Sequence, residues 1–265
     1  MEQEIFWFVF QGANLLLLPD TDGALHVARG FTPPLPVSGT IHRIGTCQGL
    51  ACAAYATEDL AVGWTATELR ASYEIIGPER YGLAGRGFQL IHWDGNSRYC
   101  PVCGAATQPA TWISKVCPDC GKEIFPVIAT AVLALVQKGD SILLARGRNF
   151  KLPFFSILAG FLEPGETLEE CVRREVLEET GLIVENVTYF GSQPWPFPSG
   201  LMVGFFADYR AGDITLQEDE LIAAGFYSRD KLPMLPHSFS LSRRMIDAWL
   251  AGRQPTTDVC ELRRP

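Results

Sequence analysis

A group of glutamates with helical spacing stands out in the second half of this 265-residue chain. Glu175, Glu178 and Glu179 are spaced so that their carboxylates converge on one side of a helix. Carboxylates that lean toward a core repel one another unless a cation lies among them. Because hard divalent cations prefer oxygen ligands, the pattern predicts a Mg²⁺ or Mn²⁺ site that also binds substrate phosphates. The alternative is a solvated acidic helix in which Arg173 and Arg174 form ordinary i,i+4 ion pairs.

The element that must hold these acids is expected to be a helix over residues 167–179. Gly181 follows as a C-terminal cap, and a glycine-containing turn before the helix holds Glu166. Glu175 and Glu179 fall in one stripe of this helix, and Glu178 lies at its edge. The apolar residues of the same stripe, which should face a core, are Leu168, Cys171 and Val172.

Residues 160–182 fill every fixed position of the pattern G-x5-E-x7-R-E-U-x-E-E-x-G-U, where U is a hydrophobic residue. The stretch resembles the Nudix box, the signature of hydrolases that cleave nucleoside diphosphates linked to another group. This resemblance implies an α/β/α sandwich with a mixed sheet. It also implies that Glu175 and Glu179 bind the catalytic metal together with the backbone carbonyl of Ala159.

Other residues of the box are expected to support the metal. Arg174 is placed to hold carboxylates in position, and Glu166 is its expected partner. Glu178 is interpreted either as a further ligand or as the general base. Metal binding would neutralise phosphate charge and lower the pKa of a bound water, so that hydroxide attacks phosphorus near pH 7.

A second acidic run, at residues 217–220, could complete the metal shell from another loop. The resemblance points to Glu220 as the ligand. Composition alone allows Glu218 or Asp219 almost as well.

Two C-x-x-C pairs lie 13 residues apart in the middle of the chain. Cys100 and Cys103 form one pair, Cys117 and Cys120 form the other, and a glycine after each pair permits a tight turn. Four thiolates without a histidine or carboxylate close a tetrahedral shell, which indicates a structural rather than a catalytic Zn²⁺. A disulfide pair or redox-active thiols are the alternatives. We expect residues 96–125 to fold as a zinc ribbon that takes no part in the reaction.

Residues 192–198, S-Q-P-W-P-F-P, form a stiff extended loop whose aromatic rings could stack on a base or a nicotinamide ring. A proline-rich packing loop or an SH3-type ligand is the alternative. The stretch resembles the motif S-Q-P-W-P-F-P-x-S of the NADH pyrophosphatase subfamily, except that Gly200 replaces the final serine and Ser199 stands one place earlier. The candidate substrate-binding residues here are Gln193, Pro194, Trp195, Pro196, Phe197, Pro198, Ser199 and Gly200.

By the same resemblance, Arg70, Phe125 and the backbone near Ser242 are candidate substrate contacts. The subfamily usually carries an acid before the tryptophan of its zinc segment, where this chain has Thr111 before Trp112. The resemblance extends over about residues 67–250 and implies a homodimer whose site is shared between subunits.

The fold class is expected to be α/β (α+β), with three domains. Residues 1–95 should form a strand-rich N-terminal domain with a helix at residues 67–76, residues 96–125 the zinc ribbon, and residues 126–265 the Nudix sandwich. His26 and His42 lack ligand-like neighbours, so we expect structural histidines whose hydrogen bonds are satisfied.

A net charge of −8 argues against broad electrostatic capture of nucleic acid, although a metal-bound anionic substrate remains compatible with it. No window approaches the ~20 apolar residues of a membrane span, and the first residues lack the positive segment of a secretory signal. Scattered thiols suit a reducing cytosol, so we expect a cytoplasmic protein. The scattered cysteines are Cys47, Cys52, Cys171 and Cys260.

Together these patterns predict a metal-dependent hydrolase, and the resemblance to the NADH pyrophosphatase subfamily implies that it splits NADH or NAD⁺ into AMP and nicotinamide mononucleotide. The resemblance also implies removal of NAD caps from RNA 5′ ends. One alternative keeps this chemistry but uses ADP-ribose or dinucleoside polyphosphates as substrates. Another is a nucleotide sensor without turnover, against which the complete set of box carboxylates argues.

Overall fold

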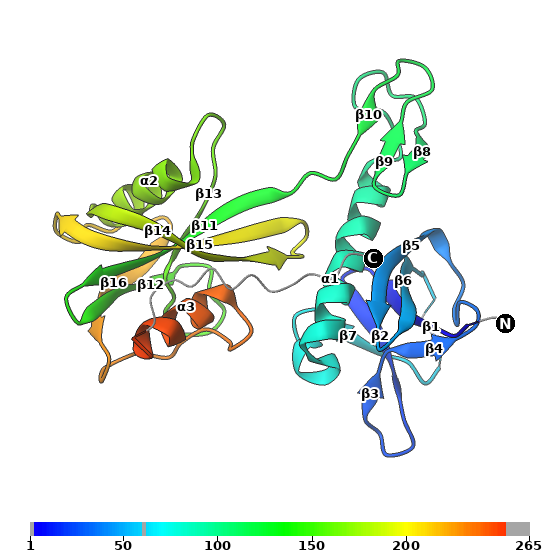
Figure 1. Ribbon diagram of the computed structural model, residues 1–265, viewed down its shortest axis with the longest axis horizontal. Coiled ribbons are helices and arrows are strands. Elements are labelled where there is room, and N and C mark those ends of the chain that lie inside the picture. Colours follow the sequence, from blue (N-terminus) through cyan, green and yellow to red (C-terminus); the bar gives the residue numbers. More distant parts are fainter. Residues whose placement is uncertain (1–2, 60–61, 253–265) are drawn as a thin grey trace. The chain divides into compact units, whose positions relative to one another are not determined.

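The computed structural model describes residues 3–59 and 62–252, and its contacts divide the chain into two compact units (Figure 1). The first unit contains the chain up to Ile128 together with Trp195–Ser199. The second contains Ala129–Pro194 and, among the described residues, 200–252. Cys260, one of the scattered thiols, lies outside the described residues.

A seven-stranded sheet forms the core of the first unit, which confirms the strand-rich expectation. Its central strand β1 pairs antiparallel with β2 and parallel with β6. The apolar run of β1 is buried on both faces, and Phe8, Val9 and Phe10 have no exposed surface. The strands are β1 (Ile5–Gln11), β2 (Asn14–Pro19), β3 (Leu25–His26), β4 (Ala28–Gly30), β5 (Ser38–Cys47), β6 (Leu50–Ala56) and β7 (Thr65–Glu68).

The helix expected at residues 67–76 is wrong in position. Strand β7 takes up its first residues, because pairing with β2 satisfies their backbone groups. The helix α1 (Tyr73–Asn96) begins later and runs much further, with a non-helical Gly77 and then Pro78 near its start. Its many glycines disfavour a helix on propensity alone. Gly87 shows why packing overrides propensity: a Cβ there would lie 2.5 Å from the Cβ of Ala54 on β6.

The cysteine-rich segment follows α1 as a small three-stranded sheet in the order β10-β9-β8. Its strands are β8 (Gln108–Thr111), β9 (Ser114–Val116) and β10 (Glu123–Ile124), and all pairings are antiparallel. Two cysteine-bearing turns flank the hairpin of β8 and β9. They occupy residues 100–104 and 117–121.

The second unit is built on a six-stranded mixed sheet in the order β14-β15-β11-β12-β16, with β13 paired to β11. The pairing of β11 with β15 is parallel, whereas β11 pairs antiparallel with β12 and β13. Its strands are β11 (Ala129–Lys138), β12 (Ser141–Gly147), β13 (Leu158–Phe161), β14 (Ile183–Trp195), β15 (Gly200–Ala211) and β16 (Leu221–Ser228).

Two helices, α2 (Leu168–Thr180) and α3 (Leu241–Leu250), cover opposite faces of this sheet (Figure 1). Successive side chains of a strand point to opposite faces, and β11 shows this alternation clearly. Val132, Ala134 and Val136 pack in the core that contains Cys171, Val172 and Val176 of α2. Leu133 and Leu135 pack in the core of α3. This arrangement confirms the predicted sandwich of helix, mixed sheet and helix. No helix in the described part of the chain is long and apolar enough to cross a membrane.

Candidate metal and substrate sites

Helix α2 is capped at both ends, which fixes where it begins and ends. Thr167 and Glu170 form a reciprocal capping box: the Glu170 backbone donates to Thr167 Oγ1 at 3.2 Å, and the Thr167 backbone donates to Glu170 Oε2 at 2.8 Å. At the other end Gly181 has φ +70°, and its N–H donates to the Leu177 carbonyl at 2.8 Å. The predicted helix and its glycine cap are therefore confirmed.

The guanidinium of Arg174 lies among three glutamates. Its Nη2 donates to Glu166 at 2.9 Å, and its Nη1 donates to Glu175 at 2.9 Å and to Glu178 at 3.0 Å. Nη2 also donates to the Phe161 carbonyl at 2.9 Å, which ties the helix to the end of β13. The hydrogen bond from Arg174 lowers the pKa of Glu166 to about 2. Arg174 thus holds the turn before the helix through Glu166, and it holds the carboxylates of Glu175 and Glu178 on the helix itself.

Gly160 on β13 makes room for the Glu175 carboxylate. A Cβ at position 160 would lie 1.8 Å from the carboxyl carbon of Glu175, far inside any real contact. Gly160 is held in register by its pairing with Val132 of β11, so the strand cannot simply move away. The exposed Ala159 precedes it on the same strand.

Glu179 is the buried acid of the group, with only 4% of its surface exposed. Among the described residues its carboxylate forms no hydrogen bond or ion pair. Burial, followed by the charges of Glu175, Glu220 and Glu178, raises the pKa of Glu179 to about 8. Burial also raises the pKa of Glu175. A buried carboxylate without a cationic partner is costly, so a divalent cation with oxygen ligands fits this set of donors.

The acidic run at residues 217–220 is joined to the end of α2. The Gln217 N–H donates to the Glu179 carbonyl at 3.0 Å. Directly after β12, Arg148 donates its backbone N–H to the Glu220 carbonyl at 2.7 Å and its Nε to the Glu218 carbonyl at 3.0 Å. Of the three acids, Glu220 is the one whose charge raises the pKa of both Glu175 and Glu179.

Sequence reasoning did not identify Arg148. Its contact with Glu218 joins residues 70 positions apart, and no local spacing signals such a contact.

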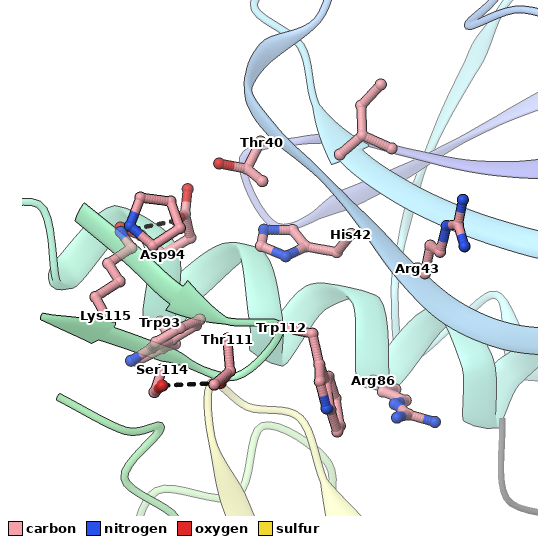
Figure 2. Close-up of a pocket in the computed structure, with 12 residues that line it drawn as sticks. Thr40, His42, Arg43, Arg86, Trp93, Asp94, Thr111, Trp112, Ser114 and Lys115 are labelled. Carbon is pink, nitrogen blue, oxygen red and sulfur yellow. Dashed lines mark hydrogen bonds and ion pairs between the residues drawn. The ribbon is translucent and has the colours of Figure 1, made fainter. Parts of the chain in front are cut away.

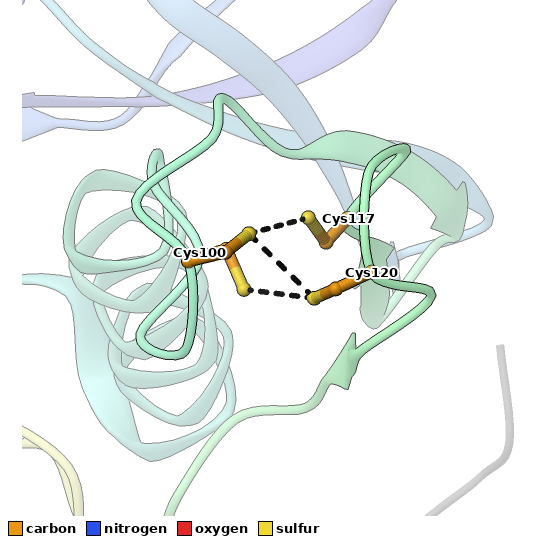
Figure 3. Close-up of side chains that lie close together, drawn as sticks. Cys100, Cys117 and Cys120 are labelled. Carbon is orange, nitrogen blue, oxygen red and sulfur yellow. Dashed lines mark hydrogen bonds between the residues drawn. The ribbon is translucent and has the colours of Figure 1, made fainter.

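The four paired cysteines come together as expected from their spacing. Their ligand atoms lie within 4.8 Å of one another, and Figure 3 shows Cys100, Cys117 and Cys120 turned inward. The nearest sulfur pairs are 3.4–3.6 Å apart, too far for a disulfide and close to the ~3.8 Å edge of a tetrahedron with Zn–S bonds of ~2.3 Å. The arrangement fits a structural zinc ion.

The two cysteine turns have the same backbone pattern. The Gly104 N–H donates to the Cys100 carbonyl at 2.9 Å, and the Gly121 N–H donates to the Cys117 carbonyl at 3.0 Å. Both glycines have positive φ, +79° and +73°, which permits each turn to wrap around its sulfurs.

The proline-aromatic loop packs its rings against Arg70 within the first unit. Trp195 and Phe197 are in edge-to-face contact at 5.1 Å, and the Arg70 guanidinium lies 5.2 and 4.4 Å from their ring centres. Pro196 lies so close to Gly85 that a Cβ there would be 2.9 Å from its ring. The structure therefore brings Arg70 together with the aromatic residues of the loop.

The other predicted substrate contacts are partly occupied by contacts within the protein. Gln193 donates to the Phe239 carbonyl at 2.8 Å and accepts from the Leu241 N–H at 2.7 Å, at the start of α3. Ser199 donates to the Val127 carbonyl at 2.8 Å. Ser242 is buried, and Phe125 is half-exposed at 51%.

Comparison with known proteins finds three family matches along the chain. The NUDIX domain matches residues 126–250, and the NADH pyrophosphatase zinc ribbon domain matches residues 96–125. The NADH pyrophosphatase-like rudimentary NUDIX domain matches residues 5–93. A relative named NAD-capped RNA hydrolase NudC, from Escherichia coli, is 42% identical over 172 residues, covering 64% of this chain and 67% of the relative. The chain belongs to the Nudix hydrolase family.

Further similarities agree with membership of the Nudix family. The NAD-capped RNA hydrolase NudC of Pseudomonas aeruginosa is 43% identical over 176 residues, covering 66% of this chain. That match spans 63% of the relative, slightly less than two thirds of its length. A crystal structure of a NUDIX hydrolase from Nitrosomonas europaea matches with a TM-score of 0.51 at 20% identity, over 59% of this chain and 92% of the other. This structural likeness shows the Nudix fold.

Proposed function

We propose that this Nudix protein is a metal-dependent pyrophosphohydrolase that cleaves the diphosphate of NADH or NAD⁺. The products would be AMP and nicotinamide mononucleotide. The observation that carries the proposal is the buried Glu179 carboxylate, which has no partner among the described residues and lies beside Glu175 at the end of a capped helix. The likeness to proteins named NAD-capped RNA hydrolase supports the choice of substrate.

Glu175 and Glu179, with the Ala159 carbonyl, would hold a catalytic Mg²⁺ or Mn²⁺. Glu220 is favoured over Glu218 and Asp219 as the acid from the second loop, because its charge acts on both helix carboxylates. Such an ion would neutralise phosphate charge and lower the pKa of a water. The residues of the protein would position the ion, the water and the phosphate.

Arg174 would keep Glu175 and Glu178 in place through its charge-assisted hydrogen bonds. Glu178 is exposed at the edge of the glutamate group, and it would act as the general base or as an additional ligand. Arg70, Trp195 and Phe197 would bind the nicotinamide end of the substrate, since aromatic faces suit a planar ring. The remaining proposed contacts are Phe125, Gln193, Pro194, Pro196, Pro198, Ser199, Gly200 and Ser242.

We further propose that the enzyme acts as a homodimer. Its proposed domains are residues 1–95, 96–125 and 126–265. NAD-capped RNA is proposed as a second substrate. The same hydrolysis of the diphosphate would release the cap from the RNA 5′ end.

The test is product analysis with NADH, NAD-capped RNA, ADP-ribose and a dinucleoside tetraphosphate, each with Mg²⁺ or Mn²⁺. AMP release from NADH well above that from ADP-ribose and the tetraphosphate supports the proposal. Turnover confined to those two substrates would replace the substrate assignment, and tight binding without turnover would make the protein a sensor. Glu179→Gln serves as the control, because it removes the buried charge at nearly constant shape.

A further inference from the structure

A cavity of about 410 Å³ lies in the first unit, among β5, α1 and the hairpin of β8 and β9 (Figure 2). It shares no residue with the glutamate site or with the proline-aromatic loop. Its volume falls in the range of small-molecule binding sites, which is ~300–1,000 Å³. None of the functional roles proposed above uses it.

Two polar atoms at this cavity are buried without a partner among the described residues, namely His42 Nε2 and Trp93 Nε1. His42 is 7% exposed and Trp93 is 8% exposed, so each side chain is more than nine-tenths buried. Figure 2 shows the His42 ring extending from β5 toward α1. The expectation that His42 is a structural histidine with satisfied hydrogen bonds is therefore wrong for Nε2. Unpaired buried polar groups are rare because they are costly, and a bound ligand is one way to satisfy them.

The charged groups that line the cavity are mostly cationic. The lining contains three cations, Arg43, Arg86 and Lys115, and one carboxylate, Asp94. Lys115 already donates to the Asp94 carboxylate and to the Asp94 carbonyl, both at 2.8 Å, so that carboxylate is neutralised. Arg43 is exposed and forms no ion pair among the described residues. In a chain of net charge −8, this local excess of donors favours an anionic ligand rich in acceptor oxygens.

The cavity also offers an aromatic surface. The Trp112 ring is 61% exposed, and the Arg86 guanidinium lies 5.3 Å from its centre. Arg86 is itself held by its donation to the Ile44 carbonyl at 3.2 Å. An arginine in cation–π contact with an exposed tryptophan, with Arg43 as a second cation, is a combination that suits a base and a phosphate together.

We propose that this cavity is a second nucleotide site, which binds one nucleoside monophosphate through Arg43, Arg86 and the Trp112 ring. The phosphate accepts from the guanidinium groups, and the base lies against the indole. Trp93 Nε1 and His42 Nε2 supply hydrogen bonds at the buried end. The nucleotide is either a free monophosphate or a nucleotide of an RNA chain, since both present the same chemistry.

The experiment is an NMR titration of ¹⁵N-labelled full-length Glu179→Gln protein in buffer without added divalent metal. The reporter is the Trp93 indole N–H signal, assigned with Trp93→Phe. The probes are AMP, a 5′-phosphorylated tetraribonucleotide, adenosine and inorganic phosphate. The proposal expects AMP or the RNA to shift this signal at lower concentration than adenosine or phosphate. Tighter binding of the RNA than of AMP assigns the site to an RNA chain, and equal or weaker binding assigns it to the free nucleotide.

The matched variants carry the same charge change in the same unit. Arg43→Glu alters the cavity, whereas Arg98→Glu alters an exposed arginine outside it. We expect Arg43→Glu to weaken AMP binding about tenfold and Arg98→Glu to leave it within about twofold. Equal losses in the two variants, an unmoved Trp93 signal, or phosphate binding as tightly as AMP would each overturn the proposal. Loss of NADH turnover in Glu179→Gln with retained AMP binding keeps this site separate from the proposed catalytic one.

Discussion

The Glu175 carboxylate occupies the space into which a side chain at Gly160 would project. A Cβ at position 160 would be 1.8 Å from the carboxyl carbon of Glu175, and β13 is fixed by its pairing with β11. Glycine is therefore required here for close approach of a carboxylate to a strand, not for turn formation.

Gly160→Ala should displace Glu175 and lower kcat/KM for NADH about 100-fold, because misplacement of a ligand by about an ångström has that effect on catalysis. Gly191→Ala is the control, since a Cβ there meets nothing within 4 Å. Steady-state kinetics at saturating Mg²⁺ measures both variants. Equal activities would show that Glu175 does not need its observed position.

The stability of the protein without divalent metal should depend on pH through Glu179. The folded pKa is raised to about 8 from an ordinary value of 4.5, so the folded state holds an extra proton between these values. The free energy of unfolding should then be highest at low pH within this window and fall as pH rises toward about 8. Urea unfolding at several pH values measures this slope.

Glu179→Gln should flatten that slope, because glutamine does not titrate. Added Mg²⁺ should stabilise the wild-type protein more at the upper end of the window, where Glu179 is ionised. Zinc content is measured in parallel, so that loss of the ribbon ion is not mistaken for the effect. An unchanged slope in Glu179→Gln would contradict the assignment.

Arg174→Lys should raise the Mg²⁺ concentration needed for half-maximal activity by about tenfold, since lysine cannot reproduce the planar fork. Arg174 holds Glu166, Glu175 and Glu178 at once, and a single ammonium cannot span all three. Arg173→Lys is the matched control, because Arg173 is exposed and donates only to the Glu169 carbonyl among the described residues. Identical metal titrations for the two variants would remove Arg174 from its positioning role.

The cysteine cluster should bind one zinc ion per chain, and Cys117→Ala should abolish this binding. Loss of the ion should expose residues 96–125 to proteolysis, because the segment has only short strands to hold it. Cys52→Ala should retain zinc, since Cys52 lies outside the cluster. Mass spectrometry of the intact protein and limited proteolysis measure both effects. Full zinc content in Cys117→Ala would show that the cluster is not the site.

Local spacing was sufficient to predict the parts of the protein that depend on neighbours in the chain. The position of Glu175 and Glu179 on one face follows from helix geometry, and the C-terminal end of α2 follows from Gly181. The paired cysteine turns follow from the C-x-x-C spacing and its glycines. Successive side chains of β11 enter the cores on opposite faces of the sheet, as the pleat of a strand requires, whereas the sandwich itself was implied by the resemblance to the Nudix family.

Tertiary packing alone decided the features that join distant residues. Helix α1 forms in a glycine-rich stretch where Gly87 allows close approach to β6, and β7 forms because β2 offers a partner. Arg148 reaches Glu218, and His42 is left with a buried unpaired nitrogen, through contacts that no sequence period encodes. The physical reason is that helix and strand periods act within one element, whereas burial and long-range hydrogen bonds depend on which elements meet.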